Sequence, residues 1–401
     1  MNRIFLAEAK LQGYRTIKNL DVKLNPGLNI IIGKNGSGKT NFITFLNDAL
    51  TYNHKNLINS KTELTFAGRD KFELLSDKTI DLNMNAAGIK EFLSNDNGKF
   101  TFKYKGKSKR FNSIAPFEKE VDEKKLTFLP ILLPHGLRSS ENNLIIASPM
   151  SFTVGGTSVD ESLMMSLNEE NCYFLKIVCF DLFVEFSPIR NRLKHNPALV
   201  IEDASKIISN YFELQCELFN ESINSYLPVQ KIRINPSFNI YHDESNGQLK
   251  IENILLEYLV NDDWLPFSSL SDGTKRMFSL FADINVREGS AVLSKLPSVA
   301  NKSKIILLEE PELGIHPHQL EQFMNFLKVA SEDAQIIITT HSPQALDVLT
   351  KDTLSSLFIC SHYPENGTTI SNLNANQTEK AKAYMDEMYL SDYWRYSDLE
   401  K

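Results

Sequence analysis

The chain has few cysteines and no long apolar segment, and these two shortages exclude whole classes of protein. Its 401 residues contain four cysteines, Cys172, Cys179, Cys216 and Cys360, and these lack the spacing of a metal site. Their apolar neighbours predict buried thiols in a reducing compartment, so we expect a cytoplasmic protein. No apolar run approaches the length of a membrane span, and we expect no membrane partner. The charges in residues 1–10 do not fit a secretory signal and instead predict a first strand.

An excess of positive charge is also missing. The formal net charge of −7 does not favour a surface that clamps duplex DNA over its whole extent. Residues 99–111 are a local exception, because basic residues alternate there with aromatic ones; the basic residues are Lys99, Lys103, Lys105, Lys107, Lys109 and Arg110. This pattern fits either a nucleic-acid-binding stripe or a hairpin with an aromatic core face. We favour the hairpin, since solvated lysines are common on edge strands.

What the chain does have is a glycine-rich loop between an apolar strand and a helix. Residues 33–40 match the pattern G-x-x-x-x-G-K-[ST], after a predicted buried strand at 28–32 and before a predicted helix at 41–50. In such a loop the backbone N–H groups and the helix N-terminus face the phosphates of a nucleotide. Lys39 is expected to neutralise the β- and γ-phosphates, and Thr40 to place its hydroxyl on Mg²⁺. The residues expected to contact the nucleotide are Gly33, Asn35, Gly36, Ser37, Gly38, Lys39, Thr40 and Asn41.

A second apolar run, residues 304–308, ends in the adjacent carboxylates Glu309 and Glu310. Burying an acid without a partner is unfavourable, and acids at the carboxyl end of a parallel strand usually face a ligand. Because the chain also has a phosphate loop, the expected ligands are Mg²⁺ and the water that attacks the nucleotide. We expect Glu309 to hold Mg²⁺ or its water shell, and Glu310 to orient or deprotonate the water.

Two shorter motifs complete the set. Ser271 precedes an apolar helix, so it predicts an N-cap and a second anion-binding helix start. His341 follows the apolar run 335–339, and a histidine at a strand end can donate a hydrogen bond to a γ-phosphate. Each motif is weak alone. Their order behind the phosphate loop and the acidic strand end gives them weight.

The remaining patterns predict a mixed architecture. Residues 4–11 and 20–24 alternate as half-buried antiparallel strands do, and residues 62–135 also have a strand-like composition. Residues 160–228 have apolar positions at helical intervals, which predicts an insertion of two or three helices. Alternation returns at 232–260, with a hairpin turn at 245–247, and helices and strands alternate from residue 268 onward.

The order of the phosphate loop, Leu270–Arg276 (the LSxGxxR segment), Glu309–Glu312 (EEPE) and Thr340–Ser342 (THS) resembles the head of ABC-type ATPases. The resemblance is to the SMC/RecF/OLD-like (AAA15/AAA21) branch, and it covers residues 1–50 and 265–345. It implies an α/β P-loop NTPase fold of ABC-ATPase type. An antiparallel N-terminal β subdomain would accompany a parallel core sheet flanked by helices, with a helical insertion.

The resemblance also implies roles for residues outside the phosphate loop. Two heads would sandwich two nucleotides, and Ser271 and Gly273 of one head would contact the γ-phosphate held by Lys39 of the other. Glu312–His316 would form a loop across the dimer, and His341 would be the switch histidine. Two departures from the family pattern are Asp272, where glycine is common in transporters, and Glu309, where many relatives have aspartate. The longer Glu309 favours contact with Mg²⁺ through water.

Three lobes and one leading function follow from this resemblance. Residues 1–135 would form an N-terminal ATPase lobe, 136–230 a helical insertion or lid, and 231–401 a C-terminal lobe. The implied function is an ATP-hydrolysing dimeric switch that uses Mg²⁺. By analogy it would be a sensor or scaffold in a bacterial anti-phage system, controlling a separate effector such as a nuclease or toxin. The alternatives are a RecF-like DNA-repair ATPase, an OLD-like ATP-dependent nuclease and, least favoured, a transporter ATPase.

Overall fold

The structure is a computed structural model, and it describes the chain in part. The described residues are 3–53, 56–80, 97–133 except 125 and 127, 150–154, scattered positions from 202 to 221, 226–284 except 236–238, 244–247 and 255, and 303–396. The chain divides into two units, each described here by itself. The first comprises residues 1–135, 302–313 and 324–401, and the second comprises 136–301 and 314–323. No helix of the described residues is long and apolar enough to cross a membrane.

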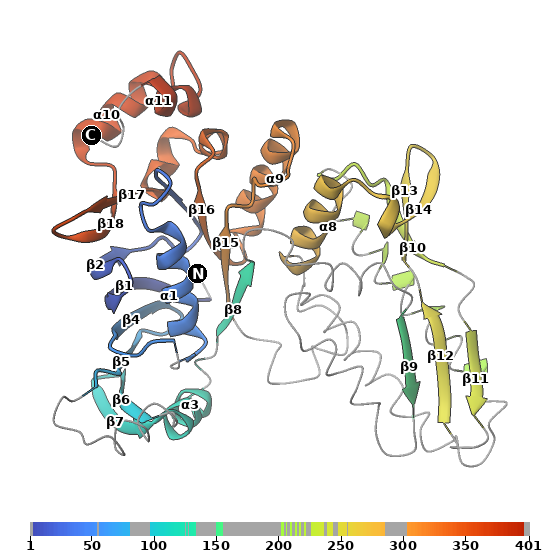
Figure 1. The fold of residues 1–401 in the computed structure, drawn as a ribbon, viewed down its shortest axis with the longest axis horizontal. Helices are drawn as coiled ribbons and strands as arrows, with labels where there is room; N and C mark the ends of the chain where they lie inside the picture. The colour runs from blue at the N-terminus through green and yellow to red at the C-terminus, as the bar shows by residue number, and fades with distance from the viewer. Residues whose placement is uncertain are drawn as a thin grey trace. The chain divides into compact units, whose positions relative to one another are not determined.

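A six-stranded sheet with five parallel strands is the centre of the first unit (Figure 1). Its strands, in spatial order, are β18 (Gly367–Asn372), β17 (Leu357–Tyr363), β3 (Leu28–Ile32), β16 (Gln335–Thr340), β15 (Ser303–Glu309) and β8 (Phe128–Leu133). Only β18 is antiparallel to its neighbour. Every residue of β3 and β16 is buried, as expected for central parallel strands covered on both faces. The predicted apolar strands are therefore confirmed.

A second six-stranded sheet of the first unit is antiparallel throughout. Its order is β2 (Ile17–Lys23), β1 (Ile4–Tyr14), β4 (Lys61–Gly68), β5 (Phe72–Asp77), β6 (Asn97–Tyr104) and β7 (Lys107–Ser113). Buried and exposed residues alternate along it, as the sequence predicts for the first two strands. The predicted hairpin is also confirmed, since Phe100 and Phe102 of β6 are buried while Lys105, Lys107 and Lys109 are exposed.

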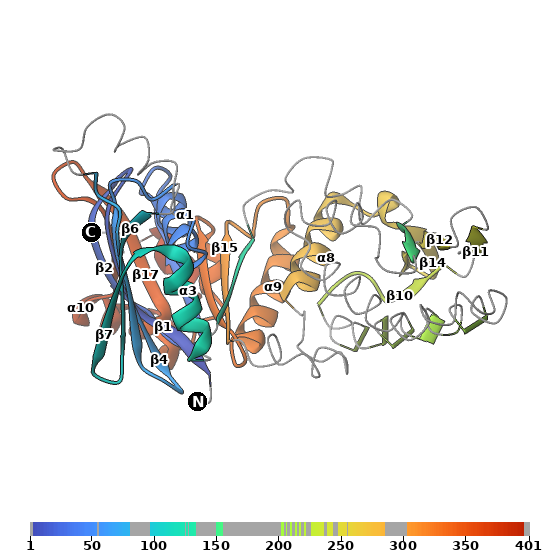
Figure 2. The same cartoon turned by 90° about the horizontal axis from the view of Figure 1, so that it is seen from below.

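Helix α1 (Lys39–Leu50) lies between the two sheets and contacts both (Figure 2). Its residues Phe42, Phe45 and Leu46 are fully buried in one apolar core shared by the two sheets. Helix α3 (Ile114–Glu123) corrects the prediction that residues 62–135 are strand-like. It forms there because Ile114, Phe117 and Val121 recur at helical spacing and bury one face in the same core.

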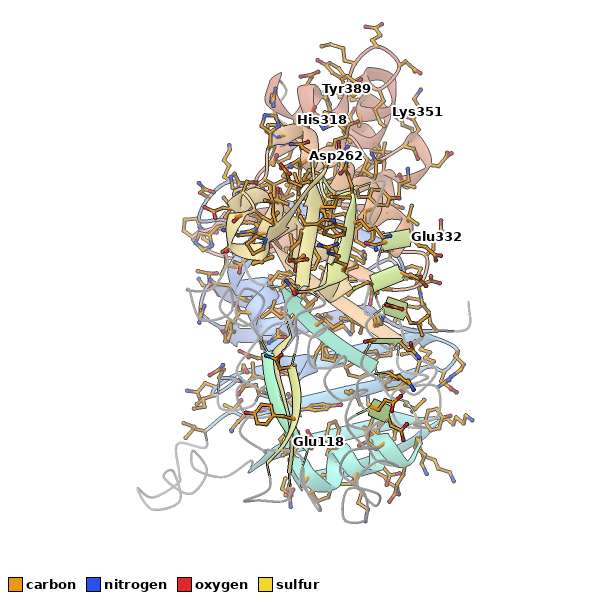
Figure 3. The ribbon with its side chains drawn as sticks, turned by 90° about the vertical axis from the view of Figure 1, so that its right-hand side faces the viewer. Glu118, Asp262, His318, Glu332, Lys351 and Tyr389 are labelled. Atoms are coloured by element: carbon orange, nitrogen blue, oxygen red, sulfur yellow. The ribbon has the colours of Figure 1, made fainter. Side chains whose placement is uncertain are left out.

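The C-terminal part of the first unit is mainly helical. It contains the second half of α9 (Pro317–Ala330), the short 3-10 helices η3 (Pro343–Leu346) and η4 (Lys351–Ser356), and the helices α10 (Ala375–Tyr384) and α11 (Leu390–Tyr396). Lys351 and Tyr389 both lie in this part (Figure 3). Lys351 pairs with Asp386, and Tyr389 is 70% exposed.

The second unit holds two three-stranded sheets and a helix. One sheet has the order β10 (Lys231–Ile234), β13 (Leu256–Val260), β14 (Asp263–Pro266), and the other β11 (Asn239–Asp243), β12 (Gln248–Ile254), β9 (Met150–Val154). The 3-10 turn η1 (Phe267–Ser269) leads into helix α8 (Asp272–Ile284). The described residues between 202 and 221 are helical, but most of the predicted insertion at 136–230 lies outside the described residues. The three-lobe division stays a prediction.

Candidate functional site

The phosphate loop, residues 33–40, runs from the end of β3 into the first turn of α1. Gly36 and Gly38 adopt positive φ angles of +81° and +106°, a conformation that glycine takes without strain. Gly38 is the N-cap of α1 and offers no side-chain hydrogen bond, so the first N–H groups of the helix lack a side-chain cap. Among the described residues, the buried Oγ of Ser37 also has no hydrogen-bond partner. These groups fit the phosphates of a nucleotide.

Lys39 places its ammonium inside this loop. The residue is 5% exposed, and Nζ donates hydrogen bonds to the carbonyl oxygens of Gly33 at 2.7 Å and Lys34 at 3.2 Å. An ammonium has three N–H donors, so one remains beyond these two bonds. The positive charge is therefore held where the phosphates are expected.

Strands β17 and β18 form a tight wall behind the loop. A Cβ added to Gly33 would lie 2.2 Å from the carbonyl oxygen of Cys360, and one added to Gly38 would lie 2.1 Å from Oγ1 of Thr368. Thr368 also donates a hydrogen bond to the carbonyl oxygen of Ser37 at 3.2 Å. Sequence reasoning missed both wall residues, because they are more than 300 positions away and belong to no motif. The wall therefore requires glycine at position 33, the φ angle favours it at position 36, and both reasons apply at Gly38.

Asn41 and the turn between β1 and β2 form a polar network beside the loop. Nδ2 of Asn41 donates to Oγ1 of Thr16 at 2.7 Å, and Arg15 donates to Oδ1 of Asn41 at 3.3 Å. Thr16 in turn shares a 2.8 Å hydrogen bond with Thr368. Both amide atoms of Asn41 are thus engaged within the chain, and its predicted contact with the nucleotide stays a prediction. Asn35 and Thr40, also predicted to contact ligands, are exposed.

The ends of three neighbouring parallel strands bring the other motifs to the same sheet edge. In the register, Ile32 at the end of β3 pairs with Thr340 of β16, and Thr339 pairs with Glu309 of β15. Because parallel strands point the same way, the residues that follow them emerge together. The phosphate loop, His341 and the pair Glu309–Glu310 therefore lie along one edge, in the order β3, β16, β15.

Glu310 has a left-handed backbone, with φ +42°. Its N–H donates to the carbonyl oxygen of Thr339 at 2.7 Å, and its own carbonyl oxygen accepts from Leu313 at 3.2 Å, which closes a turn. A residue with a Cβ is held in this region at a cost of about 1–3 kcal/mol, and such residues concentrate at functional sites. Its carboxylate is 20% exposed and lies 3.4 Å from Nδ1 of His341. The predicted base and the predicted switch histidine thus meet.

Glu312 turns its carboxylate toward the segment Thr340–Ser342, which we call the switch loop. Its Oε1 accepts hydrogen bonds from Oγ1 of Thr340 at 2.6 Å, from the backbone N–H of His341 at 3.0 Å and from that of Ser342 at 3.3 Å. Nδ1 of His341 lies 3.2 Å from the same oxygen. The resemblance predicted that Glu312 belongs to a loop across a dimer, and the sequence did not predict these contacts within the chain. The one sequence feature that could have indicated them is a third acid, which follows Pro311.

The predicted ligands of Mg²⁺ are Thr40, at the start of α1, and Glu309, at the end of β15. A hydroxyl, a carboxylate, water and phosphate oxygens are the donors that Mg²⁺ prefers, so the chemistry of this edge fits the ion. Thr40 and Glu309 both belong to the first unit. Thr40 lies in α1, which follows the phosphate loop, and Glu309 lies at the end of β15, just before Glu310.

The segment with Ser271 and Gly273 belongs to the second unit. Oγ of Ser271 accepts a hydrogen bond from the N–H of Thr274 at 3.2 Å, so the predicted N-cap of α8 is confirmed. A Cβ on Gly273 would lie 3.0 Å from the carbonyl oxygen of Gly314. Within this unit, the start of α8 therefore packs closely on the turn that follows Glu312. Contact of Ser271 and Gly273 with a nucleotide stays a prediction.

Two models of known families match the chain. The model of the AAA_23 family, described as "AAA domain", matches residues 8–254, more than half of the chain. The AAA_21 family, described as "AAA domain, putative AbiEii toxin, Type IV TA system", matches residues 170–347.

Among curated proteins, the chain is 25% identical to "Retron Ec83 probable ATPase" of Escherichia coli over 147 residues, 36% of this chain and 27% of that protein. It is 33% identical to "DNA replication and repair protein RecF" of Clostridium perfringens over 93 residues, 22% of this chain and 26% of that protein. The matches thus span about a quarter of each relative's length. A further similar protein is "Retron Vc95 probable ATPase" of Vibrio cholerae, 23% identical over 189 residues, 43% of this chain and 36% of that protein.

Solved structures with a similar chain trace include heads of SMC proteins. The Pyrococcus furiosus Smc head bound to the C-terminal domain of ScpA has a TM-score of 0.49 at 11% identity, covering 96% of this chain and 100% of that chain. The Thermotoga maritima SMC head has a TM-score of 0.45 at 14% identity, with 92% and 99% covered.

Proposed function

Because the chain belongs to the AAA_23 family of AAA domains, we propose that it binds ATP and hydrolyses it to ADP and phosphate, as an ABC-type ATPase head of the SMC/RecF type. One observation carries this proposal. The phosphate loop, Glu310 and His341 emerge from three adjacent parallel strands at one sheet edge. A phosphate cradle beside a carboxylate and a histidine is what hydrolysis of a nucleoside triphosphate requires.

Binding rests on the phosphate loop. The uncapped N–H groups at the start of α1, the hydroxyl of Ser37 and the ammonium of Lys39 would bind the phosphates. Mg²⁺, when bound with the nucleotide, supplies positive charge that neutralises the phosphate oxygens. Thr40 and Glu309 are the residues that would hold it, and Asn41 would support the loop.

Hydrolysis rests on Glu310. Its carboxylate lies 3.4 Å from Nδ1 of His341 at the strand end, where it would orient water and accept its proton. His341 lies on the neighbouring strand end and would donate a hydrogen bond to the γ-phosphate. The close contacts of β17 and β18 with the loop would favour its present conformation, so that the phosphate cradle is organised before the nucleotide binds.

The active assembly would be a homodimer, or a larger homo-oligomer built from it. Ser271 and Gly273 of one copy would bind the γ-phosphate held by Lys39 of the other, as the resemblance to ABC-type heads implies. ATP would then favour the closed dimer, because it contacts both copies only in that state, and hydrolysis would reopen it.

The output of this switch has two candidates, each with its own support. Similarity to two retron ATPases supports an anti-phage role, in which the head controls a separate effector protein. Similarity to RecF supports a role in DNA repair with direct binding to nucleic acid. The exposed lysines of the β6–β7 hairpin give the second candidate a surface on which to test it.

A phosphate-release assay on the purified full chain tests the ATPase. We expect turnover with Mg²⁺, loss of ATP binding in Lys39→Ala, and retained binding with a fall in kcat of about 10²–10⁴-fold in Glu310→Gln. Glu332→Gln is the matched control, because Glu332 is an exposed acid of the same unit that precedes β16, whereas the edge of the site follows the other end of that strand. A wild-type chain without turnover, or a Glu310→Gln variant at the normal rate, would contradict the proposal.

Light scattering and gel shift test the assembly and its output. Glu310→Gln with ATP should form a dimer that Ser271→Arg abolishes, while Ser271→Arg monomers still bind ATP. ATP-dependent binding of duplex DNA that weakens steeply between two salt concentrations would favour the RecF-like role. No binding at low salt would favour the effector-controlling role.

A further inference from the structure

The carboxylate of Glu312 is buried, and its hydrogen bonds are uneven. Its side chain is 8% exposed, and Oε1 accepts the three hydrogen bonds from the switch loop described above. Among the described residues, Oε2 of the same group is buried without a partner. An unsatisfied buried oxygen of a charged group is unfavourable, so packing alone does not account for a glutamate here.

The histidine ring of His341 is oriented by this carboxylate. Nδ1 lies 3.2 Å from Oε1 of Glu312 and 3.4 Å from Oε1 of Glu310. Ionised carboxylates only accept hydrogen bonds, so the hydrogen on the ring must be on Nδ1 to satisfy this contact. Nε2, on the other side of the ring, is then the atom left for a ligand, and it can donate to a phosphate only in the form of the ring that carries a hydrogen on both nitrogens.

The switch loop itself is held by the same oxygen. Oγ1 of Thr340 donates to Glu312 at 2.6 Å and accepts from the N–H of Ser342 at 2.9 Å, so the loop is bound on both sides of His341. Three of its consecutive residues therefore depend on one acceptor. Removing that acceptor would free the backbone of the loop and leave the ring with the longer contact to Glu310, at 3.4 Å.

We propose that Glu312 is a positioning residue for His341: its carboxylate oxygen fixes the path of the switch loop and holds the ring with a hydrogen on Nδ1. The value of this arrangement for hydrolysis rests on the proposed ATPase function, but the arrangement is a property of the ligand-free chain. Glu312 acts through His341 and touches no reacting atom.

Nitrogen-15 NMR on chains labelled at histidine tests the positioning without any nucleotide. The chain has eight histidines, and a His341→Ala variant identifies the signal of His341. We expect Nδ1–H for His341 in the wild type and in Glu312→Gln, which keeps an acceptor oxygen. Glu312→Ala should lose that tautomer. An Nε2–H ring in the wild type, or an unchanged ring in Glu312→Ala, overturns the proposal.

A double-mutant cycle tests the link to hydrolysis. Glu312→Ala should lower kcat by roughly 10–100-fold with little change in ATP affinity, as loss of an orienting partner does in other sites. In a His341→Ala background the same change should have no further effect, and Glu312→Gln should restore most of the rate. Additive losses, or a Glu312→Gln variant as slow as Glu312→Ala, overturn it. A wild type without turnover refutes the ATPase function instead, while the NMR result still decides the positioning.

Discussion

The two six-stranded sheets of the first unit share a core and differ in almost everything else. Strands β3 and β16 of the parallel sheet are buried throughout and β15 is buried in its middle, and the three end together at the edge with the phosphate loop, Glu310 and His341. The antiparallel sheet buries one face only. Its other face carries charges in cross-strand pairs, such as Lys103 with Glu73 at 2.7 Å and Lys61 with Asp77 at 3.1 Å.

This difference follows from strand direction. In a parallel sheet all the loops at one edge follow carboxyl ends, so groups from distant parts of the sequence gather there. In an antiparallel sheet the ends alternate, and neighbouring residues on the open face pair with one another instead. The edge of the parallel sheet therefore brings the candidate site residues together, and the antiparallel sheet mainly packs against α1.

Ile337→Ala should show the largest difference in stability between the sheets. Ile337 is fully buried in β16, so truncation should cost about 2–5 kcal/mol of unfolding free energy. Leu75→Ala on the half-exposed face of β5 should cost about 1 kcal/mol or less. Urea midpoints of the two variants measure this, and equal losses would break the comparison.

Gly38→Ala should damage the site more than a matched change in the other sheet. The added Cβ would meet Oγ1 of Thr368 at 2.1 Å, and the shift of the loop should lower kcat/KM for ATP by roughly 100-fold. Gly106→Ala, in the β6–β7 turn, has a similar φ of +74° but open space around the new Cβ. It should cost about 1 kcal/mol of stability and leave ATP turnover unchanged, as assays on both variants would show.

Asp48→Asn tests how the buried carboxylate of Asp48, in the helix between the two sheets, affects stability. Burial raises the pKa of Asp48, while hydrogen bonds from Asn56 and Asn53 partly oppose the shift. The folded state therefore binds the proton more tightly, and this contribution to stability is lost as pH rises through the raised pKa. Asparagine cannot ionise, so the variant should melt about 1–3 °C higher near neutral pH. The gain should shrink in acid; a constant gain would contradict this cause.

Lys103→Ala should have the smallest effect. Its ion pair with Glu73 is half exposed, with side chains 44% and 28% accessible, so the loss should be under about 1 kcal/mol. The loss should fall further in high salt, because ions screen the pair. A double-mutant cycle with Glu73→Ala measures it, and a salt-independent loss of several kcal/mol would show that this face is not simply solvated.

The sequence predicted the local elements well where one period dominated. The alternation of β1 and β2, the apolar runs of β3, β15 and β16, and the helix after the phosphate loop are all confirmed. Helix α3 was missed, because its three buried residues follow a strand-like stretch and its composition is mixed. The hairpin turn predicted at 245–247 lies outside the described residues, although β11 and β12 on either side of it pair as antiparallel strands.

In the candidate site, too, some residues could be predicted from the sequence and others could not. Residues within a motif could be named in advance, because a glycine loop, a lysine and adjacent acids have few other uses at such spacing. Thr368, Cys360 and the inward turn of Glu312 could not, since each acts on a segment far away in the sequence or across a neighbouring strand.

By itself, the sequence determined which residues of this protein are candidates to bind phosphate and to activate water, because that candidacy depends on side-chain chemistry and local spacing. Only the tertiary structure decided that these residues meet at one edge, that two strands wall the loop, and that Glu312 faces His341. The reason is physical: strand order and register are set by burial of the whole core, which no single segment encodes.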